Sequence, residues 1–151
     1  MNVREIMSKD PVCCTPETSV VDAAKLMVEN DCGQIPVVQD QQSRRLVGVV
    51  TDRDICCRVV ARNLTPASIK VRDCMSSPVA TVTGDMQITE CLRVMDENVV
   101  RRVPVVDDRG ACCGIVSQAD LVEKAPKDYA QQVARNAGQQ RRWSSSSSLT
   151  H

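Results

Sequence analysis

Two pairs of residues in the sequence are the clearest candidates for a functional site. In each pair, a residue with a hydroxyl group is followed three positions later by an aspartate. Thr51 is followed by Asp54, and Ser117 by Asp120, and each pair comes directly after an apolar run. One interpretation is a capping box, in which the two side chains satisfy backbone N–H groups at a helix start. The other is a ligand site, in which both side chains bind the same molecule. The spacing alone fits both interpretations.

The residues of common catalytic sites are scarce. The only histidine is His151, the last residue. This position argues against Ser–His and Cys–His nucleophilic pairs and against histidine-based zinc sites. The sequence also lacks a glycine-rich phosphate loop of the Walker type and a G-x-G-x-x-G fingerprint. We therefore expect no catalytic residues, no catalytic cofactor and no enzyme.

Nine cysteines are distributed along the chain, six of them in adjacent pairs. The pairs are Cys13–Cys14, Cys56–Cys57 and Cys112–Cys113. The number is odd and no Cys-x-x-Cys occurs, so neither a disulfide framework nor a zinc ribbon is indicated. We expect cysteine to serve as a small buried hydrophobe, with no metal site, and redox sensing is the alternative.

Composition narrows the classes of partner. Nineteen basic and 19 acidic residues balance, which argues against a nucleic-acid binder. No apolar stretch approaches the roughly 20 residues that span a bilayer, and the start lacks a signal-peptide apolar region, so no membrane partner and a cytoplasmic location are expected. There is no Phe, and Tyr129 and Trp143 are the only aromatics. The core must therefore be aliphatic, and base stacking on aromatic side chains is excluded from most of the chain.

An internal repeat organises the sequence. Four blocks recur in the same order with small insertions between them. The matched blocks are Val3–Ser8 with Val71–Ser76, Asp10–Val12 with Ser77–Val79, Ile35–Val38 with Val103–Val106, and Gly48–Ile55 with Gly114–Leu121. At about 60 residues, neither copy buries enough surface to be stable on its own, so we expect the two copies to share one hydrophobic core.

Each copy is predicted to contain a strand, a helix, a hairpin and a closing helix. The first helix has an apolar face and a capping box at Ser19-x-x-Asp22, and in both copies it ends at an asparagine suited to the left-handed conformation. The residues on these faces and at these ends are Val20, Ala23, Ala24, Met27, Val28 and Asn30, and Ile88, Cys91, Leu92, Met95 and Asn98. The hairpins follow at 35–50 and 103–116, and the closing helices at about 52–62 and 118–124.

The fold class is therefore α/β, with domains at 1–63 and 71–124 and a linker at 64–70. A short C-terminal helix is predicted at 125–138. The tail, 139–151, contains five consecutive serines and is predicted to be disordered.

The doubled pattern resembles a stand-alone tandem pair of CBS domains, also called a Bateman module. The motifs that carry the resemblance are Val-Arg-x-x-Met-Ser, an apolar residue before Pro-Val-Val, and Gly-Val-Val-Thr-x-x-Asp, and it covers about residues 1–124. It implies two β-α-β-β-α repeats packed with pseudo-twofold symmetry, association as homodimers, and an adenosine-containing ligand bound in the clefts between the repeats.

The resemblance also implies roles for particular residues. Asp54 and Asp120 would hold ribose hydroxyls, and Thr51 and Ser117 would contact ribose or phosphate beside free N–H groups of the helix start. The adenine ring would lie against apolar residues and backbone groups on either side, with arginines on the phosphate. The adenine-side residues are Val12, Cys13, Gln34, Ile35 and Pro36 in one copy and Val79, Thr81, Arg102, Val103 and Pro104 in the other, and the phosphate candidates are Arg53, Arg101 and Arg102.

The second copy has Ala119 where the first has Arg53, so the two sites are expected to be unequal. The predicted function is a regulatory or signal-transduction module that binds AMP, ADP, ATP, NAD or a related adenosyl ligand and acts on a protein target in trans. The alternative is a constitutive dimerisation or structural module with a cysteine-based redox response.

Overall fold

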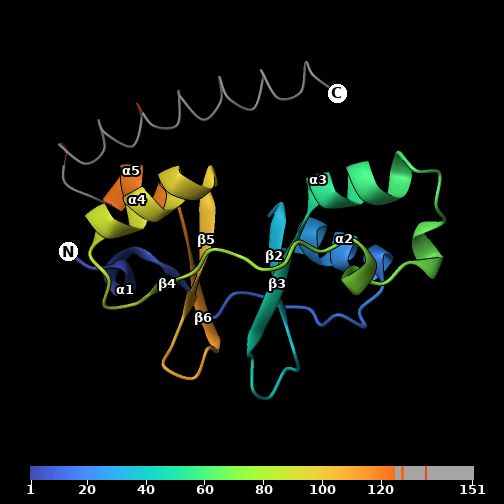
Figure 1. Ribbon diagram of the computed structural model, residues 1–151, viewed down its shortest axis with the longest axis horizontal. Helices are drawn as coiled ribbons and strands as arrows, with labels where there is room; N and C mark the ends of the chain where they lie inside the picture. Colours follow the sequence, from blue (N-terminus) through green and yellow to red (C-terminus); the bar gives the residue numbers. More distant parts are fainter. Residues whose placement is uncertain (125–126, 128–134, 136–151) are drawn as a thin grey trace. The chain divides into compact units, whose positions relative to one another are not determined.

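The computed structural model describes residues 1–124, 127 and 135 (Figure 1). The predicted C-terminal helix and serine-rich tail lie outside the described residues. The α/β fold class is confirmed. The elements in chain order are α1 (Val3–Ile6), β1 (Ser8–Lys9), α2 (Val20–Glu29), β2 (Gln34–Val38), β3 (Leu46–Thr51), α3 (Asp52–Ile55), η1 (Cys56–Val60), η2 (Pro66–Ser68), η3 (Val71–Asp73), β4 (Val82–Thr83), α4 (Ile88–Asn98), β5 (Arg102–Val106), β6 (Cys112–Ser117) and α5 (Gln118–Lys124).

Two compact units form, and their boundaries differ from those of the sequence repeats. The first-repeat unit consists of Asp10–Val79 and Val106–Cys113. The second-repeat unit consists of Met1–Lys9, Ala80–Val105 and the described residues from Gly114 onward. The opening segment of each repeat therefore packs in the unit that is built mainly from the other repeat.

Hydrogen bonds hold both exchanged segments. In the second-repeat unit, the Val3 N–H donates to Met86 O at 2.9 Å, and β1 pairs antiparallel with β6. In the first-repeat unit, the Val71 N–H donates to Thr18 O at 2.8 Å. Ser76 forms an antiparallel bridge with Val49 of β3.

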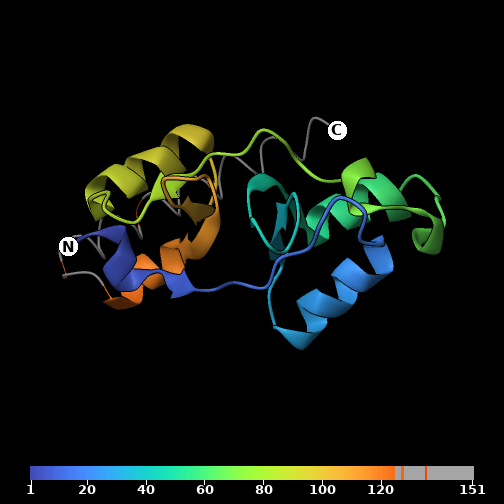
Figure 2. The same ribbon diagram turned by 90° about the horizontal axis from the view of Figure 1, so that it is seen from below.

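The two units share one strand order. The sheet of the second-repeat unit runs β1-β6-β5-β4. In the first-repeat unit, β2 and β3 form an antiparallel hairpin that is flanked by the Ser76 bridge on β3 and by a parallel bridge between Cys14 and Val37 on β2. In two views, α2 and α3 lie on the same side of this hairpin (Figures 1 and 2). The repeat in sequence is therefore a repeat in topology.

Helix α2 forms as predicted, with two differences: its capping box is incomplete, and one residue of the predicted apolar face is exposed. Ser19 Oγ accepts the Asp22 N–H at 3.1 Å, but among the described contacts the Asp22 carboxylate does not return the bond, so only half of the predicted capping box forms. Val20, Ala23 and Met27 are buried as expected. Val28 is 82% exposed, because it lies beyond the edge of the buried face. Its assignment to the apolar face was wrong.

The predicted left-handed residues at the helix ends are displaced by one position. Asp31 and Val99 adopt positive φ angles of 49° and 53°, directly after the expected Asn30 and Asn98. Each asparagine instead donates a side-chain N–H to the carbonyl four residues back, at 2.9 Å for Asn30 and 2.8 Å for Asn98. The side chains thus add a second donor to carbonyls of the last helical turn.

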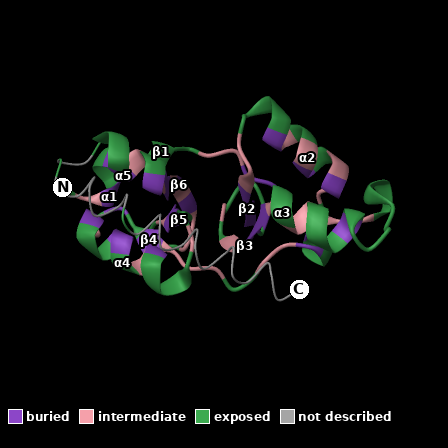
Figure 3. Ribbon diagram, turned by 90° about the horizontal axis from the view of Figure 1, so that it is seen from above, coloured by how far each residue is buried: buried purple, intermediate pink, exposed green. Residues whose placement is uncertain are grey.

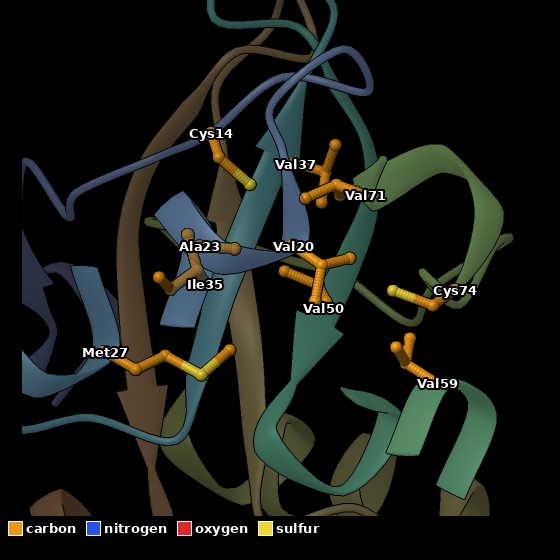
Figure 4. Packing of buried hydrophobic residues seen from close by; sticks show 10 residues of the cluster. All are labelled: Cys14, Val20, Ala23, Met27, Ile35, Val37, Val50, Val59, Val71 and Cys74. Atoms are coloured by element: carbon orange, nitrogen blue, oxygen red, sulfur yellow. The ribbon is translucent and has the colours of Figure 1, made fainter. Parts of the chain in front are cut away.

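The buried hydrophobic residues are aliphatic side chains and cysteines, as the composition predicts. Figure 3 shows where the buried positions lie along the ribbon. In the first-repeat unit, side chains from α2, β2, β3, η1 and η3 converge (Figure 4). Its buried residues are Cys14, Val20, Ala23, Met27, Ile35, Val37, Val50, Val59, Val71 and Cys74. The buried residues of the second-repeat unit include Val3, Ile6, Val82, Ile88, Cys91, Leu92, Met95, Val103, Val105, Val116 and Leu121.

The first closing helix is shorter and less regular than predicted. After the single turn of α3, the backbone widens into the π-type segment η1, where the Ala61 N–H donates to Cys56 O at 2.9 Å. The helix therefore ends at Val60 rather than at residue 62. The second closing helix, α5, begins at Gln118 as predicted and runs to Lys124, the last residue before the part of the chain that is not described.

Candidate functional site

Both hydroxyl–carboxylate pairs lie at the junction of a strand and a helix, and both form capping boxes. The Thr51 N–H donates to Asp54 Oδ2 at 3.0 Å, and the Asp54 N–H donates to Thr51 Oγ1 at 3.0 Å. The Ser117 N–H donates to Asp120 Oδ2 at 2.9 Å, and the Asp120 N–H donates to Ser117 Oγ at 3.1 Å. The capping interpretation of the spacing is therefore confirmed in both units.

The second oxygen of Asp54 is less firmly engaged. Ser76 Oγ lies 3.5 Å from Asp54 Oδ1, and Arg58 Nε lies 4.0 Å from it. Both distances exceed those of a strong hydrogen bond. The Asp54 side chain retains 13% exposure. Because a carboxylate has about four acceptor positions, capping leaves Asp54 with capacity to accept further hydrogen bonds.

The start of α3 does not offer the free N–H groups that were expected to bind phosphate. The Asp52 N–H donates to Gly33 O at 2.9 Å, and the Arg53 N–H donates to Asp52 Oδ1 at 2.8 Å. The third N–H of the turn is the one bound by Thr51 Oγ1. That expectation was wrong, because backbone and side-chain acceptors within the unit satisfy the first turn.

Strand β2 brings the first adenine-side segment next to Thr51. Gln34 is half-buried and lies opposite Thr51 in the register of β2 and β3. Ile35 is completely buried in the core, and Pro36 is buried beside it. The Ile35 side chain therefore packs inside the unit, and the polar groups of Gln34 are the part of this segment that lies near the capping pair.

The second adenine-side segment runs parallel to β2. The Cys14 N–H donates to Pro36 O at 3.1 Å, and the Val38 N–H donates to Cys14 O at 2.8 Å. Immediately before Cys14, Val12 is half-buried and Cys13 is 6% exposed. The first-repeat unit thus brings the two predicted segments side by side, because one is part of β2 and the other runs along it.

The corresponding residues of the second copy are divided between the units. Val103 and Pro104 are buried in β5, whereas Arg101 and Arg102 are exposed. Arg101 O accepts the Gln118 N–H at 2.9 Å, as Gly33 O accepts that of Asp52. Half-buried Thr81 belongs to the second-repeat unit and half-buried Val79 to the first.

Two basic residues that the sequence analysis did not single out occupy matching positions. Arg58 and Lys124 each lie four residues after the capping aspartate. Arg58 Nη1 donates to Cys74 O at 3.0 Å and to Met75 O at 3.1 Å. Lys124 Nζ donates to Ile6 O at 3.1 Å. Each cation thus binds the exchanged segment in its unit, and the i, i+4 spacing after an acid was the available signal.

A cavity of about 840 Å³ lies in the first-repeat unit, among the turns that connect β2 to β3 and β5 to β6. Its lining includes Arg44, Arg45, Arg109, Cys112 and Cys113. None of the predicted site residues lines it. No periodic pattern predicts this cavity, because it is formed by two turns that are far apart in the chain.

Within the described part of the chain, no group of three or more His, Cys, Asp or Glu side chains is arranged to hold a metal ion. Among the same residues, no helix has the length and hydropathy needed to cross a bilayer.

Residues 3–60 and 71–127 match the model of the CBS domain. The chain therefore belongs to the CBS-domain family and contains two CBS domains in tandem. It is 32% identical over 126 residues to an uncharacterised protein, MK0525, of Methanopyrus kandleri, a match that covers 83% of this chain and 63% of the relative. The chain thus spans slightly less than two thirds of that relative's length.

Solved structures give the same class. Hypoxic Response Protein I, solved with two coordinated zinc ions, has a TM-score of 0.75 at 32% identity and covers 83% of this chain and 100% of its own. The CBS pair of protein MJ0100, in complex with 5-methylthioadenosine and S-adenosyl-L-methionine, has a TM-score of 0.72 at 28% identity, over 82% of this chain and 98% of its own. CBSX2, in complex with AMP, has a TM-score of 0.70 at 28% identity, over 82% and 95%.

Proposed function

We propose that this CBS pair is a regulatory module that binds an adenosyl ligand, with Asp54 and Asp120 as acceptors for its ribose hydroxyls. The observation that carries the proposal is the likeness of the chain to two CBS pairs solved with adenosine-containing ligands, AMP in one and methylthioadenosine with S-adenosylmethionine in the other. AMP carries a phosphate group and the other two ligands carry sulfur, whereas an adenosine unit is common to all three. The proposal therefore rests on recognition of the nucleoside.

The capping boxes are compatible with this role. In the Thr51–Asp54 pair, capping uses Asp54 Oδ2 and leaves Oδ1 with only long contacts to Ser76 and Arg58. Thr51 Oγ1 accepts a hydrogen bond from the Asp54 N–H, so its own O–H is still able to donate to a ligand oxygen. One side-chain pair can thus hold its helix start and bind a sugar together.

Phosphate recognition in this proposal depends on side chains. Because backbone and side-chain acceptors satisfy the first turn of α3, a phosphate group would be bound by exposed Arg53 in one site and by exposed Arg101 and Arg102 in the other. Ala119 stands where the first copy has Arg53. We therefore expect the two sites to differ in affinity for phosphorylated ligands, and less for uncharged adenosyl ligands.

Thermal unfolding with AMP, ATP, NAD and S-adenosylmethionine tests the function. A ligand at about 100 times its Kd adds about 2.7 kcal/mol to the free energy of unfolding, which corresponds to several degrees in Tm. We expect at least one of the four to raise Tm in a saturable manner. If none of them raises Tm at millimolar concentration, the adenosyl proposal fails and a constitutive dimerisation or structural module is favoured.

Asparagine variants test the site residues separately from the function. Asp54→Asn and Asp120→Asn keep a carbonyl oxygen for the cap and remove the charge. Hydrogen bonds to a charged group contribute about 1.5–3 kcal/mol, so each variant should weaken its own site roughly 10- to 100-fold. Asp52→Asn is the matched control, because Asp52 is an exposed acid on the same turn. Ligand binding by both variants at parental affinity would refute the assignment of these acids.

The proposal extends to assembly, target and location. We propose that the protein acts as a homodimer in the cytoplasm and that ligand binding alters its contact with a separate protein. Regulation of this kind requires different ligand affinities in two conformations. The support is the family resemblance and the sequence. Sedimentation analysis with and without the stabilising ligand tests the oligomeric part, and a monomer under both conditions would contradict it.

A further inference from the structure

Two cysteines that are far apart in sequence meet in the first-repeat unit. Cys13 and Cys112 pack together with Val38 in a small buried cluster, and the two cysteines are 6% and 2% exposed. The Cys112 side chain is a hydrogen-bond partner of the Cys13 side chain. Neither cysteine forms a disulfide. The two side chains are therefore neighbours in this cluster.

Arg44 connects the same two residues. Its Nη2 donates to Cys13 Sγ at 3.2 Å and to Pro11 O at 2.8 Å. Its Nε donates to Cys112 O at 3.3 Å, and the Cys112 N–H donates to Arg44 O at 2.8 Å. The guanidinium therefore holds the two cysteine segments together, and its positive charge lies beside the Cys13 sulfur.

These contacts favour the thiolate form of Cys13. The hydrogen bond from Cys112 and the charge and hydrogen bond of Arg44 lower the pKa of Cys13 below its ordinary value, although burial opposes them. The adjacent Cys14 behaves oppositely, because burial raises its pKa to about 12. Since the thiolate is the nucleophile, Cys13 and not Cys14 is the reactive member of this pair of neighbours.

A route from solvent reaches Cys112 and Arg44, two residues that contact Cys13. Cys112 and Arg44 line the cavity of about 840 Å³ between the two hairpin turns. Hydrogen peroxide is little larger than water and fits such a space easily. Larger oxidants would be hindered by the burial of both sulfur atoms.

We propose that Cys13 and Cys112 are a redox-active pair that hydrogen peroxide converts to an intramolecular disulfide. The Cys13 thiolate attacks one peroxide oxygen, the O–O bond breaks, and the hydroxide that leaves takes a proton from solvent to become water. The Cys112 sulfur then attacks the sulfenic sulfur of Cys13, and the hydroxyl group leaves as water with the Cys112 proton. The two sulfur atoms lose two electrons in total, and peroxide is reduced to two waters.

The disulfide would join the segment before Cys14 to the start of β6. The oxidation itself requires no bound ligand, although Cys13 belongs to one of the predicted adenine-side segments. A dithiol reductant reverses the reaction by thiol–disulfide exchange.

Peptide mapping tests the proposal on the full chain. The reduced protein is treated with a few equivalents of hydrogen peroxide, remaining thiols are alkylated, and the digest is analysed by mass spectrometry. Cleavage after lysine and arginine gives the peptides Asp10–Lys25 and Gly110–Lys124, which carry the two cysteines and their neighbours. We expect these peptides to be linked, with a loss of two hydrogens, and the link to disappear after treatment with dithiothreitol.

Single variants identify the atoms involved. Cys13→Ser and Cys112→Ser should each abolish the linked peptides, whereas the matched neighbours Cys14→Ala and Cys113→Ser should retain them. Arg44→Gln should slow the appearance of the link several-fold at neutral pH. The proposal is overturned if no linked peptides form in the parent protein, or if the link persists in either Cys13→Ser or Cys112→Ser.

Discussion

Val99 is the residue whose backbone conformation fits its side chain least well. It adopts φ 53° and ψ 48°, the left-handed conformation, directly after α4. A β-branched residue in this region is an outlier, and the conformation costs an L-residue roughly 1–2 kcal/mol. The twin position after α2 holds Asp31 at φ 49°, a residue type that tolerates this conformation. The two repeats therefore differ in strain at the same place.

Val99→Asn should stabilise the protein. Relief of the backbone conformation contributes about 1.5 kcal/mol. The Val99 side chain is 43% exposed, and loss of its buried part costs about 0.8 kcal/mol. The expected net gain is about 0.7 kcal/mol, or a rise in Tm of about 2 °C.

Urea unfolding and thermal unfolding of the parent and the variant measure this gain. Val28→Asn is the matched control, because Val28 is 82% exposed and lies within a helix. Valine and asparagine have similar helix propensities, so this control should change stability by less than about 0.5 kcal/mol. A Val99→Asn protein that is less stable than the parent would refute the assignment of strain to Val99.

The remaining stability predictions concern a strand glycine and two buried thiols. Gly48→Ala should cost about 1–3 kcal/mol in urea unfolding, because a Cβ at Gly48 would lie 2.8 Å from Ser76 O, and an unchanged midpoint would contradict this. Burial raises the pKa of Cys14 and that of Cys91 from 9.0 to about 12. The folded state thus keeps protons that the unfolded state loses above pH 9, and this stabilisation, full below pH 9, is lost as pH rises toward 12. We expect the free energy of unfolding to fall across that window, and less steeply in Cys14→Ala; identical slopes would contradict the assignment.

Local structure followed largely from the sequence because it depends on local rules. Apolar spacing identified α2 and α4, β-branched runs identified the hairpins, and hydroxyl–carboxylate spacing identified both capping boxes. The errors lie where tertiary packing decides. Val28 has the right spacing for the buried face, but it is 82% exposed among the described residues. The left-handed residue is Val99 rather than Asn98, whose side chain bonds to Val94 O, and spacing does not reveal this bond.

The sequence patterns could not predict which distant segments of the chain pack against one another. Val3–Ser8 and Val71–Ser76 are near-identical blocks, so their similarity could not show which unit each one packs in. The contact between Cys13 and Cys112 joins a residue outside the named elements to the first residue of β6, and no periodicity links the two. The capping boxes show the other limit, since one spacing serves a helix start and a ligand equally well. In that case geometry confirmed the first role, and ligand recognition needs a binding experiment.

Comparison of AMP with 2′-deoxy-AMP, titrated calorimetrically into the parent protein and into the Asp54→Asn/Asp120→Asn double variant, tests the ribose assignment most directly. If the carboxylates accept the ribose hydroxyls, loss of the 2′-hydroxyl should weaken binding to the parent about 10-fold or more and have little further effect in the double variant. Equal affinity of the parent for the two nucleotides, or an equal loss in both proteins, would contradict the account.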